Sequence, residues 1–370
     1  MMSKEKRRVP KLRFPGFTED WEQRKFGDLF EYERPDAYIV KSDNYNNDFN
    51  MPVLTANKAF ILGYTNEENS YNKPSIIFDD FTLDRKYVDF PYMLKSSAIK
   101  ILTSKNQHNL RFLFERLNST RFEVLGHARH YISVVQNTTT LCPSIDEEVC
   151  ISNLLTKFDE LITLHQRKLD NLKLKKKALL QKLFPKNGDR YPELRFPGFT
   201  DAWEQRKFKD IAFKRGKISE ADLPYIEFED INSGIGTLNK NILQKVGHKK
   251  GILFEAGDVL FGKLRPYLQN WLLCQFMGIA VGDFWVFQPQ IVSSAFLYYL
   301  IQSEAYQSVA NISSGTKMPR SSWLLVSETQ FSIPKYKEAT MIGEFFTSID
   351  KNITLHQRKL DNLKLKKKAL

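Results

Sequence analysis

Apolar residues recur at alternating spacings of four and three along two long segments of the chain. The first segment covers about residues 151–184, and the second repeats its pattern up to residue 370. This alternation places apolar side chains on one stripe of a helix and is typical of a coiled-coil seam. The seam positions are Phe158, Ile162, His165, Leu169, Leu172, Lys176, Leu179 and Leu183, then Ile349, Ile353, His356, Leu360, Leu363, Lys367 and Leu370. The pattern predicts two long helices that pack through this seam.

The stretches before each long helix have a different pattern. Short runs rich in aromatic and β-branched residues, bounded by Gly, Pro, Asn and Asp, predict strands. Examples are "SIIFDDF", "SSAIKIL", "GDVLFGKL" and "DFWVFQP". Three- and four-residue spacings predict helices around 109–119 and 293–310. We therefore expect an α+β protein with two mixed α/β domains.

The chain contains an internal repeat. The eighteen letters "ITLHQRKLDNLKLKKKAL" occur at 162–179 and again at 353–370, an offset of 191. Upstream, residues 13–30 and 195–212 agree at 13 of 18 positions with an offset of 182. Because the downstream offset of 191 exceeds this upstream offset by nine, the second unit is nine residues longer than the first. Similarity at a fixed period indicates a tandem duplication with pseudo-two-fold symmetry.

The repeat aligns positions in the dissimilar middles. The aligned pairs are Pro143 with Pro334, Val135 with Val326, Arg129 with Arg320, Phe78 with Phe261 and Phe112 with Phe296. We expect one scaffold in both middles, with different surface residues.

Domain boundaries follow from the repeat. We expect a first domain at 1–150, a helix at 151–185, a linker at 186–194, a second domain at 195–338 and a second helix at 339–370. A 34-residue helix is roughly 51 Å long, whereas nine residues span at most roughly 32 Å. The linker cannot return to the start of the helix. The second helix should therefore run antiparallel to the first, with the domains at opposite ends of the pair.

Charge and cysteine content limit the class of protein to which the chain can belong. The net charge is +12 and the pI about 9.3, which favours a polyanionic partner such as nucleic acid, although the lysines could also simply solvate helix faces. Three cysteines without paired spacing predict neither a disulfide framework nor a zinc site. No stretch reaches the roughly 18 apolar residues of a membrane span. We expect a cytoplasmic protein.

The sequence lacks motifs for catalysis. It contains no GxxxxGK[ST], HExxH or GxSxG pattern and no glycine-rich turn of the kind that binds S-adenosylmethionine or a dinucleotide. His165 and Lys176 are polar residues on the apolar seam. A metal site at the histidine would need further ligands at useful spacing, so we expect no metal. Fixing the helix register is one interpretation of such residues, and snorkelling of the lysine is another.

The repeated residues carry a resemblance. "FPGFTEDWEQRKFGDL" opens the units, "LITLHQRKLDNLKLKKKALLQKLF" closes the first, and "SGTKMPRSSW" occupies 314–323. Over essentially the whole chain these features resemble the specificity subunit of a bacterial type I restriction-modification enzyme. The resemblance implies two target-recognition domains that each read half of a bipartite site in double-stranded DNA. It also implies helices that space the domains and dock two methyltransferase subunits, through which endonuclease subunits join.

The resemblance places S-adenosylmethionine, ATP and magnesium on the partner subunits and no cofactor in this chain. The second helix copy stops at Leu370 where the first continues "LQKLF". Either the second helix is shorter or the chain is a truncated form, and both alternatives leave full docking of the second methyltransferase open. Two other functions are alternatives to a specificity subunit. A self-contained DNA methyltransferase would require a cofactor motif, and a stand-alone DNA-binding regulator would purify without a methyltransferase.

Candidate DNA contacts are basic, hydroxyl and aromatic residues of predicted loops, although packing or solvation could also explain each one. The candidates are Asn57, Lys58, Lys95, Arg129 and His130 in the first domain, and Lys263, Arg265, Tyr267, Lys317, Arg320, Ser322 and Trp323 in the second. The stretch from Arg167 to Lys186 holds eight Lys or Arg and one Asp. We interpret it as a solvated face that also steers DNA electrostatically.

Overall fold

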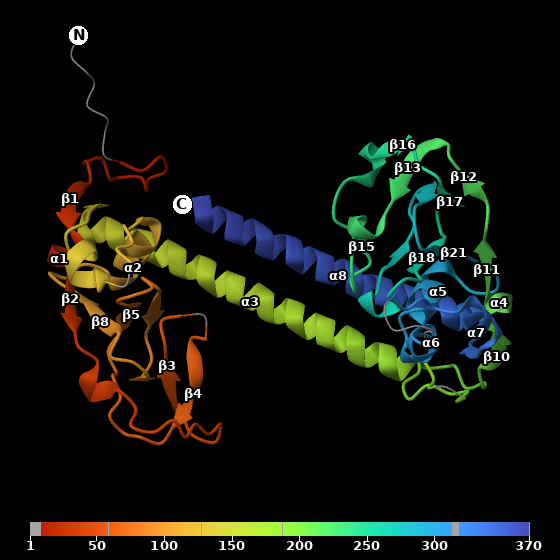
Figure 1. Ribbon diagram of the computed structural model, residues 1–370, viewed down its shortest axis with the longest axis horizontal. Coiled ribbons are helices and arrows are strands. Elements are labelled where there is room, and N and C mark those ends of the chain that lie inside the picture. The colour runs from red at the N-terminus through yellow and green to blue at the C-terminus, as the bar shows by residue number, and fades with distance from the viewer. Residues whose placement is uncertain (1–8, 58, 127, 187, 313–317, 370) are drawn as a thin grey trace, which may run out of the picture. The chain divides into compact units, whose positions relative to one another are not determined.

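The computed structural model describes residues 9–369 except 58, 127, 187 and 313–317. The chain forms two compact α+β units, one of Met1–Ile162 with Leu363–Leu370 and one of Thr163–Asn362 (Figure 1). Both long helices contribute residues to both units. Each unit is described separately.

A four-stranded antiparallel sheet occurs in both units. Its order in the first unit is β2 (Phe30–Glu33), β8 (Ile99–Ser104), β5 (Ser75–Asp79) and β6 (Arg85–Val88). Its order in the second is β11 (Ala212–Arg215), β21 (Phe284–Pro289), β18 (Val259–Gly262) and β19 (Trp271–Leu273). Phe78 of β5 and Phe261 of β18 are both fully buried in it. The same sheet in both middles confirms the predicted repeat.

A two-stranded ladder precedes the long helix of each unit. It pairs β1 (Glu22–Lys25) with β9 (Thr139–Cys142), and β10 (Glu204–Lys207) with β22 (Gln330–Ile333). Glu22 lies opposite Cys142, and Glu204 lies opposite Ile333. The two glutamates are related by the offset of 182 and their partners by the offset of 191, so the register of the ladder agrees with both sequence offsets. Short helices α1 (Phe26–Leu29) and α4 (Phe208–Ile211) follow the first strand of each ladder.

Helices α2 (Leu110–Ser119) and α5 (Ser294–Leu300) confirm the predicted equivalence of Phe112 and Phe296. The side chain of Asn109 accepts a hydrogen bond from Phe112 N, and that of Ser293 accepts one from Phe296 N. The predicted helix at 293–310 is two helices, because Ser303 caps a separate α6 (Glu304–Ala310). A further short helix, α7, covers Trp323–Glu328.

Both units also contain a second sheet, which is larger in the second unit. The first unit has a sheet of β4 (Ile61–Thr65), β3 (Met51–Leu54) and β7 (Met93–Leu94). The second has a five-stranded sheet of β12 (Ile218–Ser219), β17 (Gly251–Phe254), β20 (Gly278–Ala280), β13 (Asp222–Ile226) and β16 (Val246–His248), and a small ladder of β14 (Ile231–Asn232) with β15 (Thr237–Leu238). In both units a central strand of this sheet has one antiparallel and one parallel neighbour: β3 lies between β4 and β7, and β13 lies between β16 and β20. These three strands therefore also belong to the shared scaffold, and the described residues of the second unit add β17 and β12 to them.

The long helices are α3 (Ile145–Leu183) and α8 (Tyr336–Ala369). Helix α3 begins before residue 151, where the apolar pattern started. Ser144 Oγ accepts a hydrogen bond from Glu147 N at 3.4 Å, and three acidic residues in the first turn face the positive end of the helix dipole. The helix therefore begins at Ile145 rather than at the predicted residue 151.

A matched ion pair fastens each repeated "RFPGF" segment to a long helix. Arg13 donates from Nε and Nη2 to the two oxygens of Glu147, both at 2.8 Å. Arg195 does the same to Glu338, at 2.7 and 2.8 Å. Both glutamates are buried, so a paired guanidinium is needed to offset their desolvation.

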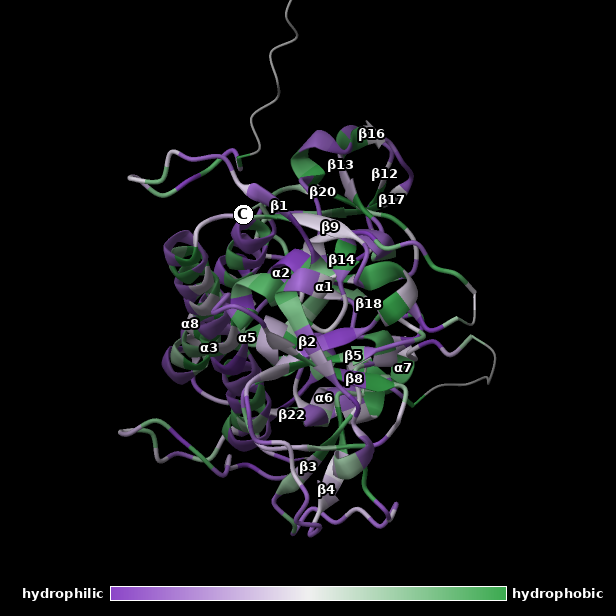
Figure 2. Ribbon diagram, turned by 90° about the vertical axis from the view of Figure 1, so that its left-hand side faces the viewer, coloured by the Kyte–Doolittle hydropathy of each residue, from purple (hydrophilic) through white to green (hydrophobic). Residues whose placement is uncertain are grey.

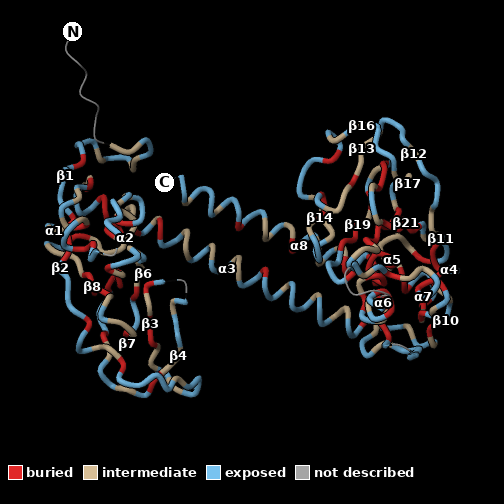
Figure 3. Tube along the Cα trace, viewed as in Figure 1, coloured by how far each residue is buried: buried red, intermediate tan, exposed pale blue. Residues whose placement is uncertain are grey.

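The predicted seam residues are buried to different degrees. In the second unit α3 and α8 are antiparallel, because His165 contacts His356 while the later Lys176 contacts the earlier Asp350. Most of the outward-facing surface of both helices is hydrophilic and exposed (Figures 2 and 3). Seam residues Leu169, Ile353 and Leu360 are buried, whereas Phe158, Ile162, His165, Leu172, Leu179, Ile349, His356 and Leu363 are half-buried.

The seam lysines have ionic partners. Lys176 Nζ lies 2.7 Å from Asp350 in the second unit, and Lys367 Nζ lies 2.7 Å from Asp159 in the first. Both lysines and both aspartates are 191 residues apart, so the two ion pairs are copies of each other. An ion pair with the opposite helix, rather than snorkelling, explains a lysine on the apolar seam.

Candidate nucleic-acid interface

The two basic stretches of the second domain lie side by side. Arg265 N donates to Pro319 O at 2.7 Å, and Ser321 N donates to Lys263 O at 2.9 Å. An isolated antiparallel bridge joins Leu264 to Arg320 between them. The structure therefore brings together two stretches that the sequence places more than fifty residues apart.

The cations of this surface share one carboxylate. Arg320 Nη2 lies 3.0 Å from Asp283 Oδ2, and Lys263 Nζ lies 3.5 Å from Asp283 Oδ1. Burial tends to raise the pKa of Asp283, but the hydrogen bond and charge of Arg320, together with Lys263, lower it overall. The carboxylate is therefore ionised at neutral pH and orients both cations.

Next to this cluster, the β18–β19 connection has an unusual backbone. Arg265 and Gln269 adopt left-handed conformations, with φ of 48° and 59°. They flank a 3₁₀ turn at Pro266–Leu268 that leaves Tyr267 exposed. Left-handed backbone is uncommon for residues other than glycine and concentrates at functional sites. The turn presents Arg265, Tyr267 and Gln269 on one exposed connection.

Ser322 and Trp323 have structural contacts. Ser322 Oγ caps α7 by accepting a hydrogen bond from Leu325 N, and the Trp323 ring packs on Phe208, Trp285 and Phe287. Lys214 lies over the Trp323 ring, with Nζ 4.4 Å from the ring centroid. Burial, followed by the charge of Lys263, lowers the pKa of Lys214. No periodic pattern in the sequence indicated Lys214, which joins this surface only through folding. Lys317 lies outside the described residues.

In the first domain, Arg129 occupies the place of Arg320. His130 N donates to Asp80 O at 2.8 Å, as Ser321 N donates to Lys263 O in the second domain. The exposed Arg129 guanidinium lies 5.8 Å from the centre of the Phe81 ring. Equivalent arginines thus lie beside the corresponding hairpin in both domains.

His130 does not belong to the exposed surface. Its side chain is fully buried, with Nδ1 3.0 Å from Asp80 O and Nε2 accepting from Leu125 N at 2.9 Å. Both ring nitrogens are used within the protein. The sequence did not reveal this because a histidine beside an arginine in a loop has no local signature of burial.

Asn57 and Lys95 follow the neighbouring parallel strands β3 and β7. Lys95 N donates to Leu54 O at 3.2 Å, and the Lys95 ammonium is paired with Asp43. The exposed Asn57 accepts a hydrogen bond from Thr55 Oγ1. The structure places these two candidates near each other at one sheet edge, and Lys58 lies outside the described residues.

The hairpin loops differ in charge between the domains. In the first, Asp80 and Lys100 form a buried ion pair at 3.8 Å, with side chains only 1% and 4% exposed. In the second, the equivalent loop position is Lys263, which is 32% exposed beside an Arg320 that is 52% exposed. One scaffold therefore presents two different surfaces.

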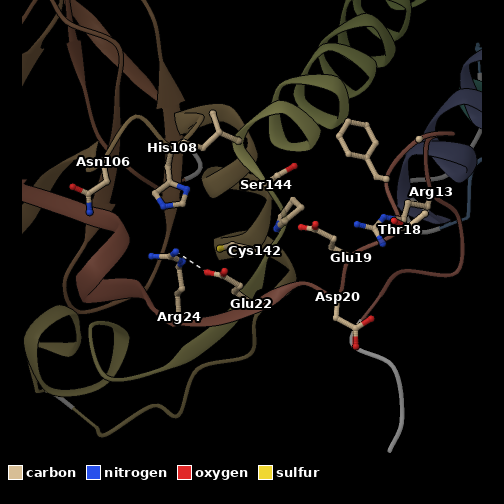
Figure 4. Close-up of a pocket in the computed structure, with 14 residues that line it drawn as sticks. Arg13, Thr18, Glu19, Asp20, Glu22, Arg24, Asn106, His108, Cys142 and Ser144 are labelled. Atoms are coloured by element: carbon tan, nitrogen blue, oxygen red, sulfur yellow. Dashed lines mark hydrogen bonds and ion pairs between the residues drawn. The ribbon is translucent and has the colours of Figure 1, made fainter.

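A cavity of about 450 Å³ lies in the first unit at the start of α3 (Figure 4). Its ionic side chains are largely used within the protein: Arg24 pairs with Glu22, Arg13 with Glu147, and His108 with Glu148. Burial is the largest effect on Glu148 and raises its pKa. The lining combines both signs of charge, and burial raises the pKa of the Cys142 thiol in it to about 12, which disfavours the nucleophilic thiolate. We assign it no catalytic role.

A metal-binding cluster and a membrane-spanning helix are both absent from the described ranges. No group of three or more His, Cys, Asp or Glu residues there could hold a metal ion. Among the described helices, none combines the length and apolar content needed to cross a bilayer.

Comparison with known proteins agrees with this geometry. Residues 18–174 and 200–365 match the family model of the type I restriction modification DNA specificity domain. The chain belongs to this family of DNA specificity proteins. The specificity-subunit identity predicted from the sequence is confirmed.

Two individual relatives are also specificity subunits of type I restriction enzymes. The Escherichia coli EcoR124I/EcoR124II specificity subunit is 44% identical over 115 residues, which cover 29% of this chain and 28% of that subunit. The Methanocaldococcus jannaschii MjaVIII specificity subunit is 20% identical over 402 residues, covering 97% of this chain and 92% of that subunit.

Solved structures share the fold. The crystal structure of the type I restriction-modification S subunit from M. genitalium has a TM-score of 0.67 at 13% identity and covers 97% of each chain. A structure from work on complex assembly and conformational transition of the type I system has a TM-score of 0.51, also at 13% identity. At this identity the likeness concerns the fold.

Proposed function

We propose that this chain reads a bipartite site in double-stranded DNA, with one half-site for each of its two domains. The observation that carries the proposal is the matched position of Arg129 and Arg320 beside loops of different charge. An equivalent position means that each domain presents a cation beside the same hairpin of its four-stranded sheet. Different neighbours mean that the two contacts select different DNA.

The long helices serve as the scaffold in this proposal. Leu164 and Leu174 lie off the seam of α3 and are exposed, as are their copies Leu355 and Leu365 on α8. Apolar residues on a helix face need a covering partner, and copied positions suit two copies of the same partner. We assign these positions to two methyltransferase subunits, through which endonuclease subunits join.

The chemistry then belongs to the partners. The chain acts as a non-catalytic recognition subunit, and S-adenosylmethionine, ATP and magnesium bind to the methyltransferase and endonuclease subunits. A stand-alone regulator would bind DNA equally well without a methyltransferase. Co-purification separates the two proposals, because a specificity subunit is recovered together with its methyltransferase.

Exchange of one variable middle tests the division between the domains. Residues 213–334 are replaced by the corresponding middle of another specificity subunit, and methylated motifs are read by methylation-sensitive sequencing. We expect one half of the motif to change while the other half and approximately the spacer are retained. A change in both halves would show that the domains do not read independently.

A further inference from the structure

Asp283 has an unusual position among the candidate DNA contacts of the second domain. Its backbone carbonyl accepts a hydrogen bond from Lys263 N at 2.8 Å, which fixes the carboxylate beside the loop that carries the cations. Its side chain then holds both Lys263 and Arg320. A protein that binds a polyanion does not ordinarily place a carboxylate among its binding cations, because the carboxylate repels phosphate.

The described residues of the first domain lack this arrangement. There Asp80 N donates to Ala98 O at 2.9 Å, as Lys263 N donates to Asp283 O in the second domain. Ala98 therefore occupies the place of Asp283 and carries no charge. Arg129 has an aromatic neighbour, Phe81, in place of a carboxylate. The acidic group is a property of the second domain alone and is not required by the shared scaffold.

The geometry around Arg320 explains what the carboxylate can do. A guanidinium carries five N–H donors in one plane. Asp283 accepts one hydrogen bond from Nη2, which restrains the guanidinium, while the half-exposed side chain keeps its other donors for a further partner. Paired donors held in a plane match O6 and N7 of guanine. A phosphate, by contrast, would have to approach past a negative carboxylate.

Resting on the function proposed above, we propose that Asp283 is a positioning residue for sequence selectivity. It holds Arg320 in the orientation for reading a base and weakens the attraction of Lys263 and Arg320 for the DNA backbone. Removal of its charge frees both cations for phosphates. Binding then becomes tighter on DNA of any sequence and less selective for the correct half-site.

The test compares Asp283→Asn with Asp201→Asn in the full chain purified with its methyltransferase subunits. Asp201 lies in the same domain and pairs with Lys335 at 2.6 Å, and both its side chain and that of Lys335 are well exposed. The control therefore removes the same charge at a site that holds no candidate DNA contact. Melting temperatures of both variants establish that they fold.

Two duplexes serve as probes. One carries the motif found methylated in cells, and the other carries that motif with the half-site of the second domain scrambled. For Asp283→Asn we expect roughly fivefold tighter binding of the scrambled duplex and a salt dependence steeper by about one to two counterions. The ratio of the two affinities should fall by about tenfold. Asp201→Asn should change each affinity less than about twofold.

The outcomes separate this inference from the proposed function. Wild-type complex that binds both duplexes equally contradicts half-site reading itself. If the wild-type complex prefers the correct duplex but Asp283→Asn and Asp201→Asn behave identically, only the role of Asp283 is overturned. If Asp283→Asn melts early, Arg320→Lys tests the same relationship, because it keeps the charge but removes the planar fork. For Arg320→Lys, loss of selectivity with unchanged binding to the scrambled duplex supports the inference. Retained selectivity in this variant overturns it.

Discussion

His165 and His356 meet with their Nδ1 atoms 2.9 Å apart, although they are the same residue in two copies of one segment. Because the two helices run antiparallel in this unit, contact between a residue and its own copy places a local two-fold axis between them. Within the second unit, the helix pair is therefore built on that symmetry. One ring must donate and the other accept in this contact, so at least one Nδ1 is unprotonated.

The histidine pair predicts a pH dependence of stability. Burial, then the charges of His356, Lys359 and Lys168, lower the pKa of His165 below its usual value of about 6.5. The unfolded state therefore binds more protons as the pH falls from about 7 through the lowered pKa, and the free energy of unfolding decreases in that window. Thermal melts followed by circular dichroism at pH 7.5, 6.5 and 5.5 measure this effect. Replacement of both histidines by glutamine should flatten the profile, whereas replacing the exposed His248 should leave it.

Charge on the seam should disrupt the helix pair. Leu169 is buried, and an aspartate there would place an unpaired carboxylate among apolar side chains at a cost of about 3 kcal/mol or more. We expect Leu169→Asp with Leu172→Asp to lower the melting temperature and to abolish co-purification with the methyltransferase. Lys173→Asp with Lys175→Asp is the matched control on exposed positions of the same helix. Equal effects of the two double variants would contradict the heptad assignment.

The copied ion pairs should not be equivalent in energy. Asp350 accepts from Lys176 and from the Tyr299 hydroxyl, so Asp350→Asn deprives both donors of a charged acceptor. Asp159 accepts from Lys367 and Arg111, but Glu115 remains within reach of both. We expect Asp350→Asn to cost about 1–3 kcal/mol and Asp159→Asn clearly less. Urea unfolding of the full chain compares them, and the reverse order would show that Glu115 does not substitute for Asp159.

Arg320→Ala tests direct base reading by the second domain. A bidentate contact with a base would cost about 1–3 kcal/mol of binding free energy and relax the sequence preference at one position. A contact with phosphate alone would weaken all duplexes alike and reduce the salt dependence by about one counterion. Titrations at several salt concentrations distinguish these results. Arg206→Ala, which removes an exposed arginine paired with Glu204 in the same domain, is the control.

The isolated chain should not transfer methyl groups. Incubation with DNA and radiolabelled S-adenosylmethionine should yield no labelled DNA until the methyltransferase subunits are added, because the sequence carries no motif for that cofactor. Transfer that persists in the homogeneous chain would favour the alternative of a self-contained methyltransferase.

Local patterns explain why much of the scaffold could be predicted. The seam of α3 and α8 was visible because helical neighbours are three and four residues apart, so burial leaves a short-range signature. The repeat was equally visible, since duplication is a property of the letters themselves. The equivalence of Arg129 and Arg320 followed from the offset of 191 and agrees with their backbone contacts.

The sequence by itself thus determined the family, the repeated scaffold and the helix pairing, while only the tertiary structure decided which charged groups share a site. Asp283 and Arg320 are 37 residues apart, and no spacing rule relates them. Their contact depends on the strand order β21–β18–β19 and on the bridge from Leu264 to Arg320. The same holds for the burial of His130 and for Lys214 over Trp323. Such contacts arise when chain segments distant in sequence pack together, and the energy that selects them is distributed over the whole core.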